Sequence, residues 1–233
     1  MTAAGSENDV KAAARELFER DPIERHPLFV ELAGGDLSLD QVRSVALQIH
    51  HVVDHFPRLL AAMLANMRDH RLRMPLVENL FEEHGRMDPA RVHVETYRAF
   101  LEGLGIDRHA IARSEPAICV LAYNRAVLDL CFHHPQAEGL GALGIIEEIV
   151  ARVSPVVARI VRSMREGGGS LVHFSDHEVL DLTHADEIYE LASQAVLLGE
   201  NRETVILGMR LGWYYHRRLY ADLLAMARGR LVP

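Results

Sequence analysis

The segment His-Glu-Val-Leu-Asp-Leu-Thr-His, residues 177–184, carries three side chains of types that bind metal ions. His177, Asp181 and His184 are spaced i, i+4 and i+7, and because an α-helix advances about 100° per residue, they share one helical face. The same face continues with three apolar residues: Ile188, Leu191 and Ala195. This face is expected to be buried, and metal coordination would offset the free-energy cost of burying a carboxylate. Imidazole and carboxylate together suit iron, manganese or zinc better than calcium. A solvated polar stripe, or histidines satisfied by hydrogen bonds, is the alternative.

A second pair of candidate ligands is Glu83 and His93. Glu83 stands at the C-terminal end of a predicted helix, where the helix dipole disfavours a carboxylate unless another charge compensates it. His93 lies in the first turn of the next predicted helix. A sharp turn at Gly85 would direct both side chains to one point, although the acidic residues before this turn could equally be solvated.

Two adjacent glutamates at positions 147 and 148 supply another carboxylate. They point about 100° apart on a helix, so one is expected to face inward and the other outward. Glu147 shares its face with apolar residues, whereas Glu148 can pair with Arg152 one turn later. We therefore expect Glu147 to face the interior, and a solvated glutamate pair is the alternative.

The elements that position these residues are predicted to be helices, because the apolar residues recur with helical periodicity and no strand alternation is found. Capping boxes at Ser38–Gln41 and Ser175–Glu178 mark two helix starts, and Pro89 is placed in the first turn of a third. The pattern indicates one all-α domain, residues 1–233, with about seven to nine helices. They cover about 7–20, 27–33, 39–68, 72–84, 89–104, 115–133, 138–165, 176 onward and 203–229.

Composition narrows the class of protein. The chain has 233 residues, 49% of them hydrophobic, so it can bury a sizeable core. Its net charge of −8 argues against nucleic-acid binding. No apolar run reaches the roughly 18 residues of a membrane span, and no apolar signal core opens the chain. Two cysteines without CxxC spacing suit a reduced compartment. We expect a cytoplasmic protein with no nucleic-acid or membrane partner.

Four motifs follow one another along the chain. They are His26-Pro27 with Leu32, Gly35, Leu37-Ser38 and Gln41, then Glu83-x-Gly85 with His93, then Glu147, and finally His177-x3-Asp181-x2-His184. In their order and spacing they resemble the heme-oxygenase-like diiron oxidases and oxygenases, which are related in fold to thiaminase II and pyrroloquinoline quinone synthase. The resemblance covers about residues 26–190.

This resemblance implies a heme-oxygenase-like helical bundle that binds two Fe(II) ions and uses O2 as co-substrate. The same types of ligand could also bind manganese. It implies oxidation of a small molecule, either amine N-oxygenation or oxidative C–C or C–H cleavage of an amino-acid-like or fatty-acid-like substrate, in a biosynthetic role. The metal ligands would be Glu83, His93, Glu147, His177, Asp181 and His184.

Some members add a glutamate on the long early helix. This chain has none between residues 32 and 77. Asp54, His50, His51 or His55 could substitute for it, and Asp54 is our preference. Arg125, Arg210 and Tyr214 are candidates for binding the substrate.

Two other functions remain open from the sequence. One is a cofactor-poor thiaminase-like hydrolase or quinone-synthase-like oxidase of the same fold, with Cys131 as the nucleophile candidate. The other is a non-enzymatic binding or adaptor protein whose acidic surface meets a partner. A homodimer is compatible with the apolar cluster of Leu211, Trp213 and Tyr214, which could equally be ordinary core.

Overall fold

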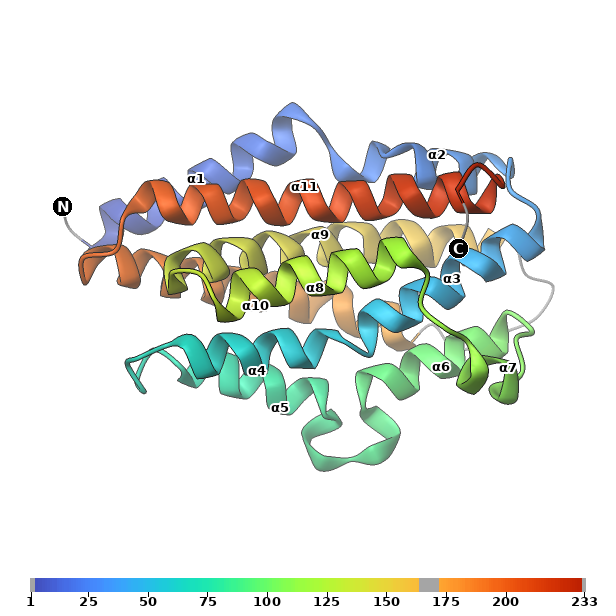
Figure 1. The fold of residues 1–233 in the computed structure, drawn as a ribbon, viewed down its shortest axis with the longest axis horizontal. Helices are drawn as coiled ribbons and strands as arrows, with labels where there is room; N and C mark the ends of the chain where they lie inside the picture. The colour runs from blue at the N-terminus through green and yellow to red at the C-terminus, as the bar shows by residue number, and fades with distance from the viewer. Residues whose placement is uncertain (1–2, 164–171, 232–233) are drawn as a thin grey trace.

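The computed structural model describes the backbone of residues 3–163 and 172–231, and the side chains of residues 9–162, 173–174 and 182–231. These residues form α-helices and short 3-10 turns and contain no strand, so the predicted all-α fold is confirmed (Figure 1). The α-helices are α1 (Ala3–Arg20), α2 (Pro27–Gly34), α3 (Leu39–Val53), α4 (Phe56–Asn66), α5 (Met74–Glu83), α6 (His93–Gly103), α7 (Arg108–Arg113), α8 (Ile118–Phe132), α9 (Gln136–Ser163), α10 (Val172–Leu197) and α11 (Arg202–Ala227).

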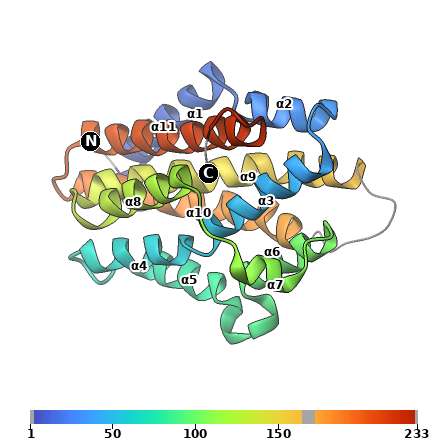
Figure 2. The same ribbon diagram turned by 45° about the vertical axis from the view of Figure 1, so that its right-hand side comes forward.

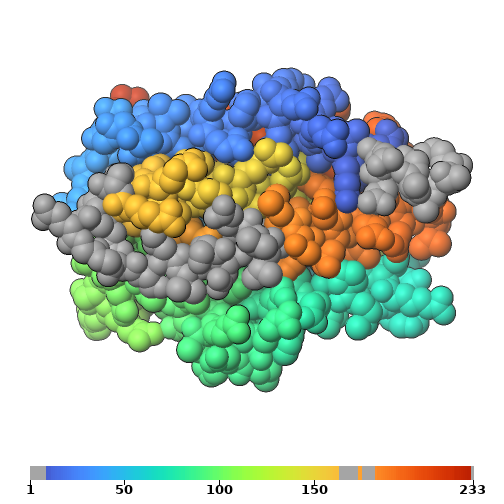
Figure 3. All heavy atoms as spheres, turned by 180° about the vertical axis from the view of Figure 1, so that it is seen from behind, coloured from blue at the N-terminus to red at the C-terminus, as the bar shows by residue number. Residues whose placement is uncertain are grey.

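The long helix α9 runs through the middle of the bundle. It packs against α10 and α11 along its length and also touches α8, α4 and α2. Helices α1, α2 and α11 cover one side of it, and α4 to α7 form the opposite side (Figures 1 and 2). Seen from behind, α10, in orange, lies between α1 and the α4–α5 region (Figure 3). No helix in the described part of the chain is long and apolar enough to cross a membrane.

The N-terminal parts of α9 and α11 approach each other through glycine. A Cβ added to Gly208 would overlap the backbone carbonyl oxygen of Glu138, and one added to Gly212 would lie 2.8 Å from the carbonyl oxygen of Ala142. Since the contacts advance together along both helices, α9 and α11 run parallel here. Only a residue without a side chain permits this separation.

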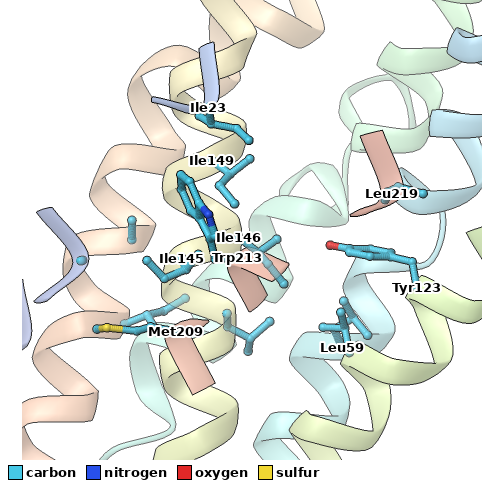
Figure 4. Close-up of a cluster of buried hydrophobic side chains, with 14 of the residues drawn as sticks. Ile23, Leu59, Tyr123, Ile145, Ile146, Ile149, Met209, Trp213 and Leu219 are labelled. Carbon is cyan, nitrogen blue, oxygen red and sulfur yellow. The ribbon is translucent and has the colours of Figure 1, made fainter. Parts of the chain in front are cut away.

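Apolar side chains of α8, α9 and α11 build the core beside this contact. Trp213 is buried and meets the Phe18 ring edge-on, with ring centroids 4.8 Å apart. Figure 4 shows Ile145 and Ile146 on opposite sides of α9, with the Tyr123 ring extending from α8 toward Ile146. Of the apolar cluster noted on the last helix, Trp213 therefore belongs to the core, whereas Tyr214 is 59% exposed.

The helix predicted over residues 39–68 is wrong as a single element. It consists of α3 and α4, which are separated at Asp54–His55. Pro57 explains the break, because it has no N–H to donate to the carbonyl of Val53. The predicted cap at Ser38 is confirmed: its hydroxyl accepts from Gln41 N, and the Gln41 side chain accepts from Ser38 N.

Two helix starts also differ from the prediction. Pro89 lies in a separate 3-10 turn, Pro89–Arg91, and α6 begins only at His93. Helix α10 begins at Val172, so position 175 lies inside the helix and does not cap it. The added turn is stabilised by packing, because His173 lies 4.9 Å from the Tyr97 ring and Phe174 lies 4.8 Å from the Phe100 ring. The short helix α7 was not predicted.

Candidate metal centre and its cavity

Glu83 and His93 meet across a tight chain reversal. Gly85 has a φ of +64°, and a Cβ there would lie 2.6 Å from the backbone of Arg91 and Val92, so the turn requires glycine. The reversal brings His93 Nδ1 to 2.8 Å from Glu83 Oε1, and both side chains are buried. The expected convergence of these two residues is confirmed.

Glu147 faces the interior, as its helical position predicts, with 3% of the residue exposed. Asn79 Nδ2 donates a hydrogen bond to Glu147 Oε1 at 2.6 Å. Glu148 instead accepts hydrogen bonds from Arg152 and from the Tyr189 hydroxyl. The two adjacent glutamates thus have separate environments, one at the site and one in a structural ion pair.

His184 links α10 to both α5 and α9. Its Nε2 lies 2.6 Å from Glu82 Oε2, and its Nδ1 lies 4.0 Å from Glu147 Oε1. The sequence reasoning missed Glu82 as a member of this group. The signal was present, because Asn79, Glu82 and Glu83 are spaced i, i+3 and i+4 and therefore share one side of α5.

The cluster concentrates negative charge in the interior. Glu82, Glu83 and Glu147 are carboxylates with little exposure, and the first two are adjacent in sequence. Burial alone would raise the pKa of Glu82, but hydrogen bonds from Arg86 and His184 outweigh it and hold this pKa below its ordinary value. A cluster of this kind requires compensating positive charge, from imidazolium groups or from metal ions.

The donor chemistry fits iron. Carboxylate oxygens and imidazole nitrogens are ligand types that iron accepts, and Asn79 Oδ1 is a buried acceptor with no hydrogen-bond partner among the described residues. A nearby cation would satisfy it. The described side chains alone do not bring three His, Cys, Asp or Glu groups into a metal-binding arrangement. Their imidazoles instead pair directly with carboxylates.

His177 and Asp181 lie outside the described side chains. The backbone of α10 is continuously helical from Val172 to Leu197, so residues 177, 181 and 184 do fall on one helix, as predicted. Their role as ligands stays a prediction.

Asp54, the expected substitute for the absent early glutamate, lies elsewhere. It follows the last turn of α3, is exposed, and has a carboxylate oxygen 3.8 Å from Arg98 Nη2. It contributes to neither the Glu83–His93 pair nor the Glu147–His184 pair. Its backbone continues the helical turn of α3, which directs the side chain toward Arg98 of α6.

The three candidates for substrate binding are surface residues. Arg125 of α8 and Arg210 and Tyr214 of α11 are all exposed. None of them lines the apolar cavity described below. On α11 the inward face instead carries His216 and Tyr220, which the sequence reasoning did not select. Their signal was an i, i+4 polar pair on the stripe that also contains Met209 and Trp213.

A cavity of about 170 Å³ adjoins the carboxylates. Glu83 and Glu147 form part of its wall, and most of the remaining wall is apolar. The aliphatic part includes Val45, Ile49 and Val153. An apolar cavity of roughly 150 Å³ holds a benzene molecule, so this one accommodates a ring with a small substituent.

The buried cysteine considered as a nucleophile is outside this cavity. Cys131 is 0% exposed and does not line the cavity wall. Burial raises the pKa of its thiol to about 12. A thiol with this pKa is not a thiolate near neutral pH, so the structure does not favour the cysteine-dependent hydrolase.

Comparisons with known proteins agree with this architecture. The family of iron-containing redox enzymes matches residues 43–217. A 4-aminobenzoate synthase from Chlamydia pneumoniae is 28% identical over 192 residues, covering 79% of this chain and 81% of that protein. A CADD-like protein of unknown function from Nostoc punctiforme has a TM-score of 0.78 at 20% identity, covering 97% of this chain and 98% of its own. A domain of unknown function with a heme oxygenase-like fold from Shewanella denitrificans has a TM-score of 0.72 at 16% identity, covering 98% and 94%. The predicted heme-oxygenase-like fold is confirmed.

Proposed function

Because the chain belongs to the family of iron-containing redox enzymes, we propose that it is a non-heme diiron enzyme that uses O2 to oxidise a small apolar molecule. The observation that carries this proposal is a buried carboxylate–imidazole cluster that forms part of the wall of an apolar cavity. Di-iron helical bundles use carboxylates and histidines that project inward in this way. The name of the Chlamydia relative, a 4-aminobenzoate synthase, supports a biosynthetic role.

Six residues of this chain would hold the two Fe(II) ions: Glu83, His93, Glu147, His177, Asp181 and His184. Bound iron would supply the reduction of O2, which no amino-acid side chain performs. Two further residues act on these ligands. Asn79 fixes the Glu147 carboxylate by its 2.6 Å hydrogen bond, and Glu82 fixes the ring of His184.

Two contacts of His184 fit one tautomer of its ring. When Nε2–H donates to Glu82, Nδ1 is the nitrogen that keeps its lone pair, and it lies 4.0 Å from Glu147 Oε1. A carboxylate that accepts the second N–H of a histidine orients the ring and raises its basicity as a metal ligand. We assign Glu82 this positioning role.

The cavity selects and protects the substrate. Its apolar wall favours an apolar molecule by the hydrophobic effect, roughly 25 cal/mol for each Å² of apolar surface removed from water. Glu83 and Glu147 are themselves buried, which strengthens the electrostatic interactions of these carboxylates. The substrate is expected to be about as large as a monosubstituted benzene.

Anaerobic titration with Fe(II), followed by exposure to O2, tests the proposal. The wild-type protein should bind about two irons and develop a transient visible absorption on oxidation. Parallel titration with Mn(II) compares the second metal. Glu147→Gln should weaken metal binding at least about tenfold, because it removes one anionic ligand while keeping the size of the side chain.

Glu148→Gln is the matched control, since this neighbour on the same helix pairs with Arg152 and Tyr189 instead. It should bind iron as the wild type does. A wild-type protein that binds no iron would refute the diiron proposal, and thiamine cleavage by such a protein would favour the hydrolase. Equal losses in both variants would show that the cluster around Glu147 is not the metal site.

A further inference from the structure

Three buried polar side chains lie in the cavity wall apart from the carboxylates. Tyr123 of α8 has its hydroxyl 2.8 Å from His216 Nδ1, and the hydroxyl of Tyr220 lies 3.0 Å from His216 Nε2. All three residues are at most 5% exposed and line the cavity. They form a continuous hydrogen-bonded chain, Tyr123–His216–Tyr220. Figure 4 shows the Tyr123 hydroxyl pointing away from α8 into the interior.

Counting hydrogens shows that this chain has one donor to spare. Burial lowers the pKa of His216 to about 3, so the ring is neutral and carries a single N–H. Each tyrosine carries one O–H, which gives three polar hydrogens for two hydrogen bonds. If His216 accepts from Tyr123, the hydroxyl of Tyr220 keeps its hydrogen, and in the other tautomer the hydroxyl of Tyr123 keeps it.

The spare hydrogen has no acceptor elsewhere among the described residues. The hydroxyls of Tyr123 and Tyr220 contact no hydrogen-bonding group there other than His216. Tyr97, a third tyrosine of the cavity wall, differs, because its hydroxyl donates to the backbone carbonyl of Ala46 at 3.0 Å. A buried donor without an acceptor is unfavourable by about 1 to 3 kcal/mol, so a ligand that supplies an acceptor is favoured.

We infer that the Tyr123–His216–Tyr220 chain is a ligand-binding subsite that donates one hydrogen bond to a neutral oxygen acceptor, such as a carbonyl or ether, on an otherwise apolar arene-sized molecule. The identification of this ligand with the substrate rests on the proposed function. An anionic acceptor is disfavoured, because the described residues of the cavity wall include no Lys or Arg and do include Glu83 and Glu147.

A matched pair of probes tests the subsite on metal-free protein. Acetophenone and α-methylstyrene have nearly the same shape and differ by C=O against C=CH2. In a dry cavity without a donor, their ratio of affinities should follow their ratio of water-to-cyclohexane partition coefficients. The wild-type protein should favour acetophenone by a further factor of at least about 10, because the partition ratio already includes loss of the carbonyl's hydrogen bond to water.

The infrared C=O stretch of bound, ¹³C-labelled acetophenone gives a direct second reading. It should be lower than in cyclohexane for the wild type and for the control Tyr97→Phe. Removal of any one or two members of the chain still leaves at least one donor, so the test variant is the triple change Tyr123→Phe, His216→Leu and Tyr220→Phe. In this variant both the frequency shift and the extra preference for acetophenone should disappear.

Several outcomes would overturn the inference. They are a cyclohexane-like frequency in the wild type, an affinity ratio equal to the partition ratio, loss of the shift in Tyr97→Phe, or tighter binding of benzoate than of acetophenone. If the triple variant does not fold, the affinity ratio and the C=O frequency measured with the wild-type protein still test the inference. Iron plays no part in these measurements, so failure of the diiron proposal and failure of this subsite are distinguishable.

Discussion

The N-terminal parts of α9 and α11 touch through glycine, whereas the continuation of the same two helices encloses the cavity. At the first end, Gly208 and Gly212 leave no room for a side chain against the backbone of α9. At the second end, α9 presents Val153 and Ile160 and α11 presents His216 and Tyr220 to the cavity. The same pair of helices, α9 and α11, therefore forms a backbone-to-backbone contact at one end and part of the cavity wall at the other.

Side-chain size decides this difference. Glycine lets two helix backbones approach directly, and large residues beyond it hold them apart. Glu147 stands on α9 between the glycine contact at Gly141 and the cavity-lining Val150. The backbone that carries Glu147 is therefore held by the close helix contact, while its carboxylate faces the cavity. A preorganised site requires such support.

The largest effect is expected for Gly208→Ala. Its Cβ would overlap the carbonyl oxygen of Glu138, a backbone atom that cannot move without shifting α9. We expect the free energy of unfolding to fall by about 2 to 3 kcal/mol, as measured by chemical denaturation. Gly34→Ala adds the same methyl group where it meets only the flexible side chain of Asp36. It should be nearly neutral, and equal losses in both variants would contradict the glycine contact.

The second expectation concerns acid stability at the hollow end. Burial lowers the pKa of His216 to about 3 in the folded protein, against 6.5 ordinarily. Between these values the unfolded chain binds more protons, so stability falls as the pH is lowered through this window. The loss approaches about 1.4 kcal/mol per pH unit for this residue. In His216→Gln, the unfolding free energy should depend less steeply on pH between about 6 and 4, and an unchanged slope would contradict the assignment.

The smallest effect on stability is expected for Val153→Ile, which adds one carbon at the cavity wall. Free space is available there, so the free energy of unfolding should change by less than about 1 kcal/mol. The cavity becomes smaller, however, and acetophenone should bind more weakly. A loss of stability as large as that of Gly208→Ala would show that the two ends do not differ in packing.

The helices and the direction of Glu147 could be predicted from the sequence because they depend on local periodicity. The phase of α9 separates Glu147 from Glu148, and the Arg152 partner one turn away confirms it. The turn at Gly85 could be predicted for the same reason, because it depends on a glycine within the turn itself. These predictions required no knowledge of which helices are neighbours.

Residues whose roles depend on a neighbouring helix could not be selected in the same way. Glu82 belongs to the site because α10 brings His184 to it, across 102 positions of sequence. Position 175 is not a helix cap because Phe174 finds a partner on α6. Arg210 and Tyr214 were chosen for their chemistry, but the phase of α11 turns them outward.

The Glu83–His93 contact has a consequence for the order in which the site assembles during folding. Its partners are 10 residues apart, whereas Glu82 and His184 are 102 apart. Closing the shorter loop loses less chain entropy, by about 2 kcal/mol on a logarithmic length scale. A loop of this size closes in roughly 10 to 100 ns. This half of the cluster is therefore accessible to the chain before α10 has docked, and the other half forms only with the complete bundle.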